Sequence, residues 1–364
     1  MTETEACIVL NMIAHVGPFR FRKLYHHFGS AVAVLQATGE LLRHVEGIGR
    51  EVAESIRTWE KQVHLDAEVA RIEAFGATVL IASDKTYPSL LRDIEDPPIV
   101  LYCWGNLEER DLQHGVGIVG TRDASHYGLE ATKKLGYQLA YAGLTVYSGL
   151  ARGIDTIAHQ AALAAHGRTI AVLGSGLEEI YPQENIPLAE KIISSGAVIT
   201  EFPMSTKPSQ YSFPKRNRII SGCSFGLLVV EAGLRSGALI SANQAMEQGR
   251  SIYCVPGRIN QPSALGSNKL IQQGAKLVMD AGDILSDFPL LFSHQPQLEH
   301  SKPTLSLKEE ELMIYESIGE EPTPIDQIIA LSSLSPALVS SKLLAMELSG
   351  HVRSMPGGRF VKLI

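Results

Sequence analysis

The sequence has few cysteines and no pattern that would join them. Its four cysteines, Cys7, Cys103, Cys223 and Cys254, are widely separated in a chain of 364 residues, and no two form a Cys-x-x-Cys pair. This spacing excludes a zinc ribbon and a disulfide scaffold, and it favours a reducing, cytoplasmic compartment. No group of His, Cys and Asp has the spacing of metal ligands, so we expect no metal site and no cofactor.

Long apolar runs and targeting signals are also missing from the sequence. No apolar run approaches the roughly 20 residues that span a bilayer. The first six residues carry Glu3 and Glu5 and lack the basic stretch of a secretory signal peptide. We therefore expect a cytoplasmic protein without a membrane partner.

Two nucleotide-binding motifs are absent or misplaced. The chain has no Walker A lysine sequence, which argues against ATP hydrolysis of that type. Gly115-x-Gly117-x-x-Gly120 matches the pattern GxGxxG, but its first two glycines precede or enter a predicted strand. A dinucleotide fingerprint needs these glycines after the strand, where the helix begins. We therefore exclude a dinucleotide site at this motif.

Negative charge predominates, but the middle of the chain is slightly basic. The 32 basic and 39 acidic residues give a net charge of −7, and 45% of the residues are hydrophobic, which is enough for cored globular domains. Residues 110–290 hold 16 basic and 14 acidic residues, a net charge of +2. An anionic partner is therefore expected to bind this middle region.

The hydrophobic pattern predicts an α/β fold with a doubly wound, parallel sheet. From residue 79 onward, short apolar stretches alternate with amphipathic stretches, which is the order of strands and helices in such a sheet. The predicted strands are residues 79–81, 99–102, 116–119, 144–147, 169–173, 197–200, 227–230 and 252–255. The predicted helices are residues 129–142, 156–166, 186–195 and 238–248.

Smaller regions flank the predicted sheet. The first 78 residues have the pattern of short helices, and Gly47-Ile48-Gly49 fits either a helix-hairpin-helix turn that approaches a phosphate or a tight turn between packed helices. A polar stretch indicates a linker, and the tail after it fits a winged helix with three helices and a hairpin. The expected divisions are residues 1–78, 79–292, 293–303 (the linker) and 304–364. Within the tail, we expect helices at 312–318, 325–331 and 336–348 and hairpin strands at 351–354 and 360–363.

The last predicted helix, residues 336–348, is the element that a winged helix often places in the DNA major groove. Here it carries mainly serines and one cation, Lys342. Residues 301–364 hold 6 basic and 8 acidic residues, a net charge of −2. This composition favours contact with a protein over contact with DNA.

Small residues follow nearly every strand of the predicted parallel sheet. Examples are Gly120, Gly149 and the run Gly174-Ser175-Gly176. Ligands bind outside the carboxyl ends of such strands, where glycine leaves backbone N–H groups open to an anion. The pattern favours a phosphate site at this edge of the sheet. The alternative is that the glycines only permit tight turns.

A basic segment with aromatic residues follows the strand predicted at 197–200. Residues 203–230 contain no acidic residue, and the sequence predicts that their basic part is a long loop. The segment holds Lys207, Tyr211, Phe213, Lys215, Arg216 and Arg218. Cations for the backbone and rings for the bases are typical of single-strand binding. The alternative is a solvated basic loop whose rings pack on the core.

Catalytic residues have no compact motif. The sequence alone allows a catalytic relay to be assembled from Ser148, Asp155, His159 and Glu231. However, Asp155 fits a helix N-cap, His159 fits a core residue one turn later, and Glu231 fits an acceptor for the following turn. We therefore predict no catalytic residue.

The order of the motifs resembles the bacterial DNA-processing protein A family, DprA or Smf. The similar segments include IVGTR at 118–122, SGLARGID at 148–155, FPKRNRII at 213–220 and GSN at 266–268. The resemblance implies an extended Rossmann-like domain that binds single-stranded DNA and forms a homodimer. It also implies a mediator that protects incoming DNA and loads the RecA recombinase during natural transformation.

The same resemblance implies DNA-binding roles for a cation, a set of small residues and the basic segment. Arg122 would bind the DNA backbone near the end of a strand. The small residues of the phosphate pocket would be Ser148, Gly149, Gly174, Ser175 and Gly176. The residues that hold the strand and its bases would be Phe213, Lys215, Arg216 and Arg218, with Lys207 in a loop that varies within the family.

An enzymatic alternative rests on a shorter likeness. Glu231-x-Gly233-x-x-Ser236-Gly237 loosely resembles the PGGxGTxxE region of nucleoside-monophosphate phosphoribohydrolases, which cleave an N-glycosidic bond. The order of glutamate and glycine differs here, and an enzyme of this kind would leave the basic aromatic segment and the flanking regions unexplained. The preferred interpretation is therefore a DNA-binding mediator that is not an enzyme.

Overall fold

The computed structural model describes residues 1–288, 307, 309–319, 322–348, 351–355 and 357–362. It separates the chain into two compact units, Met1–His294 and Gln295–Ile364. The predicted linker at 293–303 lies outside the described residues, and so do positions 356 and 363 in the region of the predicted hairpin.

The first unit is built on a nine-stranded sheet with the order β1-β2-β6-β5-β4-β3-β7-β8-β9. The strands are β1 (Thr78–Leu80), β2 (Leu101–Gly105), β3 (Gly115–Val119), β4 (Thr145–Ser148), β5 (Thr169–Val172), β6 (Ala197–Thr200), β7 (Gly226–Val229), β8 (Ser251–Cys254) and β9 (Lys276–Leu277). From β6 to β9 in this order the neighbours pair in parallel, whereas β2 is antiparallel to both β1 and β6. The predicted α/β fold is confirmed, and β2 adds an antiparallel edge to its parallel sheet.

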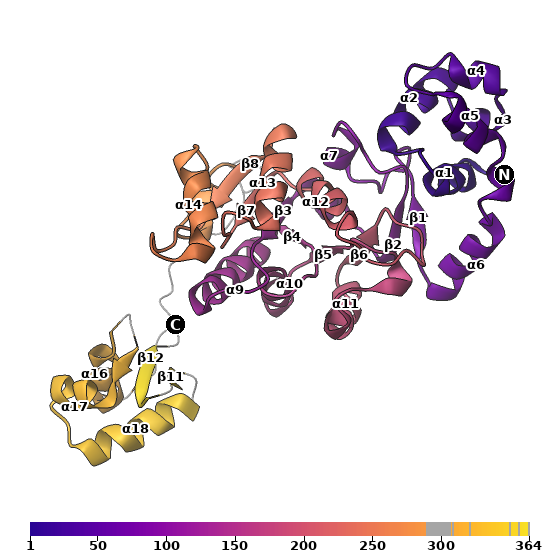
Figure 1. The fold of residues 1–364 in the computed structure, drawn as a ribbon. Helices are drawn as coiled ribbons and strands as arrows, with labels where there is room; N and C mark the ends of the chain where they lie inside the picture. The colour runs from indigo at the N-terminus through magenta and orange to yellow at the C-terminus, as the bar shows by residue number, and fades with distance from the viewer. Residues whose placement is uncertain (289–306, 308, 320–321, 349–350, 356, 363–364) are drawn as a thin grey trace. The chain divides into compact units, whose positions relative to one another are not determined.

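Helices cover both faces of this sheet (Figure 1). One face carries α9 (His126–Tyr141), α10 (Ile154–Ala164) and α11 (Ile186–Ile193), and the other carries α12 (Ser212–Gly222) and α13 (Gly237–Glu247). The other α-helices described after β1 in this unit are α7 (Ser89–Arg92), α8 (Glu109–Gln113), α14 (Leu265–Gln272) and α15 (Ala281–Leu285), and short 3-10 helices span Leu177–Glu179, Gln183–Asn185 and Pro262–Ala264. Every residue of β3, β4 and β5 is buried, as expected for apolar strands covered on both faces.

The first two glycines of the GxGxxG pattern lie inside β3. A Cβ on Gly117 would lie 2.6 Å from Cδ1 of Leu227 in β7, and a Cβ on Gly115 would lie 2.3 Å from the carbonyl oxygen of Cys223. Both distances are too short for a real Cβ. These two glycines therefore serve close packing within the sheet.

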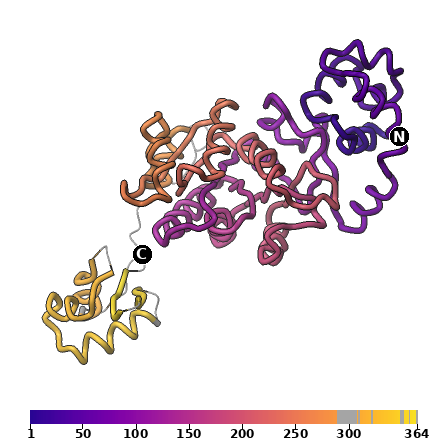
Figure 2. Tube along the Cα trace, viewed as in Figure 1, coloured from indigo at the N-terminus to yellow at the C-terminus, as the bar shows by residue number. Residues whose placement is uncertain are grey.

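The N-terminal helices share a hydrophobic core with the sheet. They are α1 (Glu3–Met12), α2 (Pro18–Phe28), α3 (Ala31–Gln36), α4 (Gly39–Arg43), α5 (Arg50–Arg57) and α6 (Leu65–Phe75), and the chain trace passes from α6 into β1 (Figure 2). Leu10 and Leu24 of these helices belong to the same cluster of buried residues as Tyr102 and Val198 of the sheet. The division between residues 78 and 79 stays a prediction, because both sides lie in one compact unit.

The second unit has the winged-helix order of elements. Its helices are α16 (Glu309–Ser317), α17 (Ile325–Ser332) and α18 (Pro336–Leu348), and its strands β10 (Thr323–Pro324), β11 (Val352–Met355) and β12 (Arg359–Lys362) form a sheet in the order β10-β12-β11. In α18, Lys342 Nζ lies 3.0 Å from Glu310 and 3.5 Å from Glu311. These acids compensate the one cation of α18, and protein contact through this helix stays a prediction.

Within the described residues, no single helix is long and apolar enough to span a membrane, and only α17 and α18 together, bent by 112°, meet that criterion on length and composition. No group of three or more His, Cys, Asp or Glu in the described ranges is placed to hold a metal ion.

Candidate nucleic-acid interface

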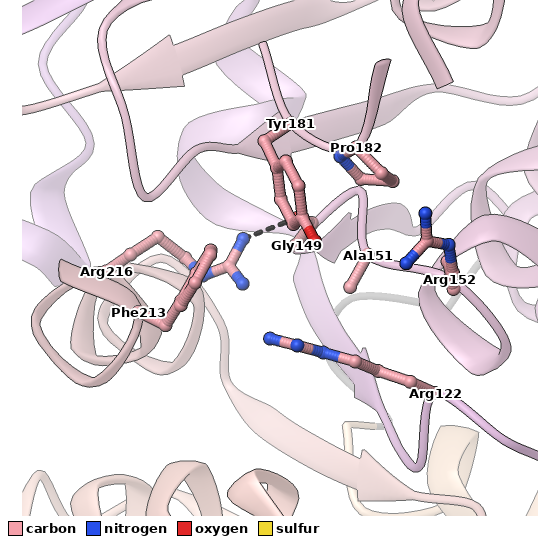
Figure 3. Close-up of a pocket in the computed structure, with 8 residues that line it drawn as sticks. All are labelled: Arg122, Gly149, Ala151, Arg152, Tyr181, Pro182, Phe213 and Arg216. Carbon is pink, nitrogen blue, oxygen red and sulfur yellow. Dashed lines mark hydrogen bonds between the residues drawn. The ribbon is translucent and has the colours of Figure 1, made fainter. Parts of the chain in front are cut away.

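The carboxyl ends of β3, β4 and β5 and the start of α12 surround a small open pocket (Figure 3). It is lined by Arg122, Gly149, Ala151, Arg152, Tyr181, Pro182, Phe213 and Arg216. Its enclosed volume is only about 10 Å³, far below the roughly 300–1,000 Å³ that is typical of small-molecule pockets. A site of this size at the carboxyl edge of a parallel sheet suits one group of a larger ligand.

The basic segment that approaches this pocket is a helix at its centre. The sequence pattern predicts a long loop after β6, but Ser212–Gly222 form α12. The Ser212 hydroxyl donates to the Gly174 carbonyl oxygen at 2.5 Å, which fixes the start of the helix against the end of β5. The buried side chain of Ile219 packs into the core. The prediction of a loop is therefore wrong for Ser212–Gly222. The helix is not predicted from the sequence because charged residues interrupt its apolar spacing.

The Phe213 ring lies among the cations and rings of the pocket. The guanidinium carbon of Arg122 lies 5.1 Å from the ring centroid, and that of Arg216 lies 6.0 Å from it. The Tyr181 ring centroid is 6.1 Å away, with the planes inclined by 46°. Arg122 and Tyr181 are exposed, whereas Arg216 is buried. The pocket therefore presents a cation and aromatic faces to an incoming ligand.

Arg216 supports the pocket from within the protein. Its guanidinium donates to the carbonyl oxygens of Gly149, at 2.5 Å, and of Val172 (Figure 3 draws the first bond). Burial lowers the pKa of Arg216 to about 10, although the nearby carboxylate of Asp155 acts in the opposite direction. Asp155 accepts from the backbone N–H groups of Gly149 at 3.1 Å and Ala151 at 3.4 Å, and burial raises its pKa. This buried pair of charges holds the loop that follows β4.

The small residues at the end of β4 make their polar contacts within the protein. Ser148 is fully buried, and its hydroxyl donates to the Ile118 carbonyl oxygen at 2.6 Å. The Gly149 amide donates to Asp155, and its carbonyl accepts from Arg216. Their predicted role in binding phosphate stays untested, and in this structure the groups have other partners.

The run Gly174-Ser175-Gly176 is buried beneath the basic segment. A Cβ on Gly174 would lie 2.8 Å from Cδ1 of Phe213, and one on Gly176 would lie 2.1 Å from the Met204 carbonyl oxygen. These two glycines are needed so that the following segment can approach the end of β5. The run positions Phe213, and its predicted phosphate contact stays a prediction.

Three further predicted residues lie outside the pocket lining. Arg218 is buried and forms ion pairs with Asp96, at 3.1 Å, and with Glu201. Lys207 and Lys215 are exposed on the basic segment. The structure therefore brings Arg122, Gly149, Phe213 and Arg216 of the predicted set together around one space.

The predicted set omits Arg152 and Tyr181, which line the same pocket. Arg152 Nη2 donates to Glu184 Oε2 at 2.9 Å, and both side chains are exposed. Hydrogen bonding from Arg152 lowers the pKa of Glu184. A signal for Arg152 is present in the sequence, because it follows the end of β4 much as Arg122 follows the end of β3.

The residues of the hypothetical relay have structural partners. The Glu231 carboxylate accepts from the Ser125 amide at 3.0 Å, from the Ser125 hydroxyl at 2.9 Å, and also from Gln261 and Ser263. His159 is fully buried with Nδ1 2.7 Å from Thr169 Oγ1, and burial lowers its pKa to about 3. Neither Glu231 nor His159 lines the pocket.

Comparison with known families gives matches along most of the chain. Residues 78–289 match the family model of DNA recombination-mediator protein A, and residues 299–358 match the DprA winged helix domain. Residues 9–67 match the helix-hairpin-helix motif.

Individual relatives agree with these matches. Protein Smf of Synechocystis is 35% identical over 99% of this chain and 98% of its own length. The crystal structure of DNA processing protein A from Streptococcus pneumoniae covers 79% of this chain and 98% of its own, with 32% identity and a TM-score of 0.68. A structure of DNA processing protein A from Helicobacter pylori, which describes the single-stranded DNA binding mode of that protein, covers 60% of this chain and 97% of its own, with 29% identity and a TM-score of 0.54. This chain therefore belongs to the DNA recombination-mediator protein A family, DprA or Smf.

Proposed function

We propose that this protein binds single-stranded DNA at the pocket around Phe213, with little preference for sequence. The observation that carries the proposal is the convergence of exposed Arg122, the Phe213 ring and the Tyr181 ring on one open pocket. Cations for phosphates and rings for bases are the two parts of a sequence-tolerant single-strand site. The single-strand binding described for the Helicobacter pylori relative supports the same ligand.

The side chains divide into contact residues and supports. Arg122, Arg152 and Phe213 contact the DNA in this proposal, and the exposed Lys207 and Lys215 extend the cationic surface around it. Arg216 and Arg218 are buried, so in this proposal they affect DNA binding indirectly, by holding the loops and the helix that carry the contact residues. A base that is stacked inside a duplex does not offer its face to Phe213, so a single strand is preferred.

Replacement of Arg122 by alanine is expected to weaken DNA binding for all sequences. The loss of a charge-assisted contact gives about a tenfold lower affinity, and the slope of log K against log salt becomes shallower by about 0.7. Fluorescence anisotropy with labelled single strands over a salt series measures both quantities. Lys191→Ala, at an exposed lysine of α11 outside the pocket, is the control. An unchanged slope in Arg122→Ala would remove Arg122 from the site.

Replacement of Glu184 by glutamine is expected to strengthen DNA binding. The exposed Glu184 carboxylate holds Arg152 in an ion pair beside the pocket, and it also repels an incoming phosphate. Because the pair is exposed and screened by solvent, the rise in affinity should be about fivefold or less at low salt. The matched control is Glu190→Gln on α11, at another exposed glutamate. Weaker binding by Glu184→Gln than by wild type would show that the ion pair itself shapes the site.

We infer further that the bound protein protects single-stranded DNA and loads RecA recombinase during natural transformation, as a cytoplasmic homodimer that is not an enzyme. Membership of the recombination-mediator family supports this role. The internal hydrogen bonds of Glu231 support a non-catalytic protein. Two measurements test this role: electron microscopy of RecA filament growth on single strands, and survival of those strands when a nuclease is added. Faster filament growth with wild type is expected, and no effect on growth or on nuclease protection would contradict it.

A further inference from the structure

An exposed strip of aromatic and basic residues runs along α9. The helix begins four residues after Arg122 at the edge of the sheet that holds the pocket. The residues of the strip are His126, Tyr127, Glu130, Lys133, Lys134, Tyr137 and Tyr141, and all are exposed. Their spacing of mostly three and four residues places them on one side of the helix. We call this strip the α9 outer face.

Two tyrosines near the end of the α9 outer face present flat rings to solvent. The Tyr137 side chain is 43% exposed and that of Tyr141 is 64% exposed. Their ring centroids are 6.1 Å apart, and the ring planes are within 8° of parallel. Parallel exposed rings offer the stacking surface that unpaired bases use.

The charge of the α9 outer face is complementary to a polyanion. Lys133 and Lys134 lie one turn before Tyr137 and two turns before Tyr141, and Glu130 is the one acidic residue of the strip. Neither lysine has an ion pair with any residue in the described ranges. Two lysines without an ion pair, against one glutamate, lie beside two rings; this favours nucleic acid over an apolar protein surface, which would have to bury those charges.

The α9 outer face begins close to the pocket in the chain. The N-terminus of α9 follows Arg122, and Ser125 caps it by accepting from the Gly128 amide at 3.1 Å. From there the helix rises by about 1.5 Å per residue, so Tyr141 lies about 22 Å from His126 along the axis. Arg122 lines the pocket and the first residue of this face, His126, lies four residues after it, so the chain itself links the two surfaces.

We propose that single-stranded DNA leaving the pocket continues along the α9 outer face, with its bases on Tyr137 and Tyr141 and its phosphates near Lys133 and Lys134. This inference rests on the proposed function of the pocket. This path lengthens the stretch of DNA that the protein binds. It also gives a role to Tyr137 and Tyr141, which are exposed and do not belong to the hydrophobic core.

The test compares short and long oligonucleotides on the full chain. Single-strand sites span about 4–16 nucleotides, so labelled strands at these two lengths separate the pocket from its extension. The double variant Tyr137→Ala/Tyr141→Ala should bind the long strand about tenfold more weakly than wild type and the short strand equally well. Tyr137→Phe/Tyr141→Phe keeps the rings and should bind both strands like wild type.

The other outcomes contradict either this inference or the proposed function of the pocket. If the alanine variant keeps wild-type affinity for the long strand, the inference is overturned. If that variant instead loses self-association by analytical ultracentrifugation, the α9 outer face is a protein interface and the inference is also wrong. If wild type binds neither strand, or if Arg122→Ala leaves binding of the short strand unchanged, the proposed function of the pocket fails first. Because both tyrosines are exposed, thermal unfolding should stay within a few degrees of wild type.

Discussion

Replacement of Arg216 by methionine should lower the free energy of unfolding by about 3–5 kcal/mol, because it removes two buried hydrogen bonds from a charged donor, each worth about 1.5–3 kcal/mol. The change removes the donor to the Gly149 and Val172 carbonyl oxygens and leaves Asp155 without its nearby cation. Methionine keeps most of the side-chain volume, so the loss reports the charge and its hydrogen bonds. Urea unfolding followed by circular dichroism measures it.

The pH dependence of the unfolding free energy of Arg216→Met tests whether Asp155 contributes to the loss of stability. Burial raises the pKa of Asp155 and Arg216 lowers it, so removal of Arg216 should raise it further. A folded-state pKa above the unfolded value means that stability is gained as the pH falls through that pKa. The deficit of Arg216→Met should therefore shrink in acid. Lys215→Met, at an exposed neighbour on α12, should change stability by about 0.5 kcal/mol or less. A deficit that does not vary with pH would contradict the role of Asp155.

Replacement of Phe213 by alanine should cause the largest loss of DNA affinity among the single pocket variants. Stacking of one base on an aromatic ring is worth about 1–3 kcal/mol, which corresponds to a loss of roughly five- to 150-fold in affinity. The change also removes the ring over which Arg122 lies at 5.1 Å. Equilibrium binding to a labelled single strand measures the loss.

Two further substitutions separate stacking from packing at Phe213. Phe213→Trp keeps an aromatic face and should retain most of the affinity, whereas Phe213→Leu keeps apolar bulk without a ring and should resemble Phe213→Ala. Unfolding free energies of all three variants control for the contact between Phe213 and Gly174. Equal binding by the leucine variant and wild type would show that Phe213 only packs.

Much of the fold follows from local sequence pattern. The strand predicted at 197–200 coincides with β6, and the strand predicted at 116–119 lies within β3. These strands are short apolar runs bounded by polar or small residues, so their ends are visible in the sequence. The direction of β2 is different, because an isolated strand pattern contains no information about which neighbour it pairs with. Its antiparallel pairing to β6 is visible only in the structure.

The contacts of the candidate site are harder to predict from the sequence than the fold is. Arg122 and Phe213 are predicted from the order of motifs, and the structure places them together. The burial of Arg216 and Arg218 is not predictable from composition, since arginine is seldom buried unless it is paired. The carboxylates that influence them, Asp155 and Glu201, lie 61 and 17 residues away in the chain. Spacing along one segment therefore could not reveal those contacts.

Competition between single-stranded and duplex DNA of one sequence, for wild type and for the double variant Arg122→Ala/Phe213→Ala, tests most directly whether this pocket binds the single strand. We expect wild type to prefer the single strand, and the double variant to lose most of this preference while remaining folded. Equal preference in the double variant, or a wild type that favours the duplex, would contradict the assignment of single-strand binding to this pocket.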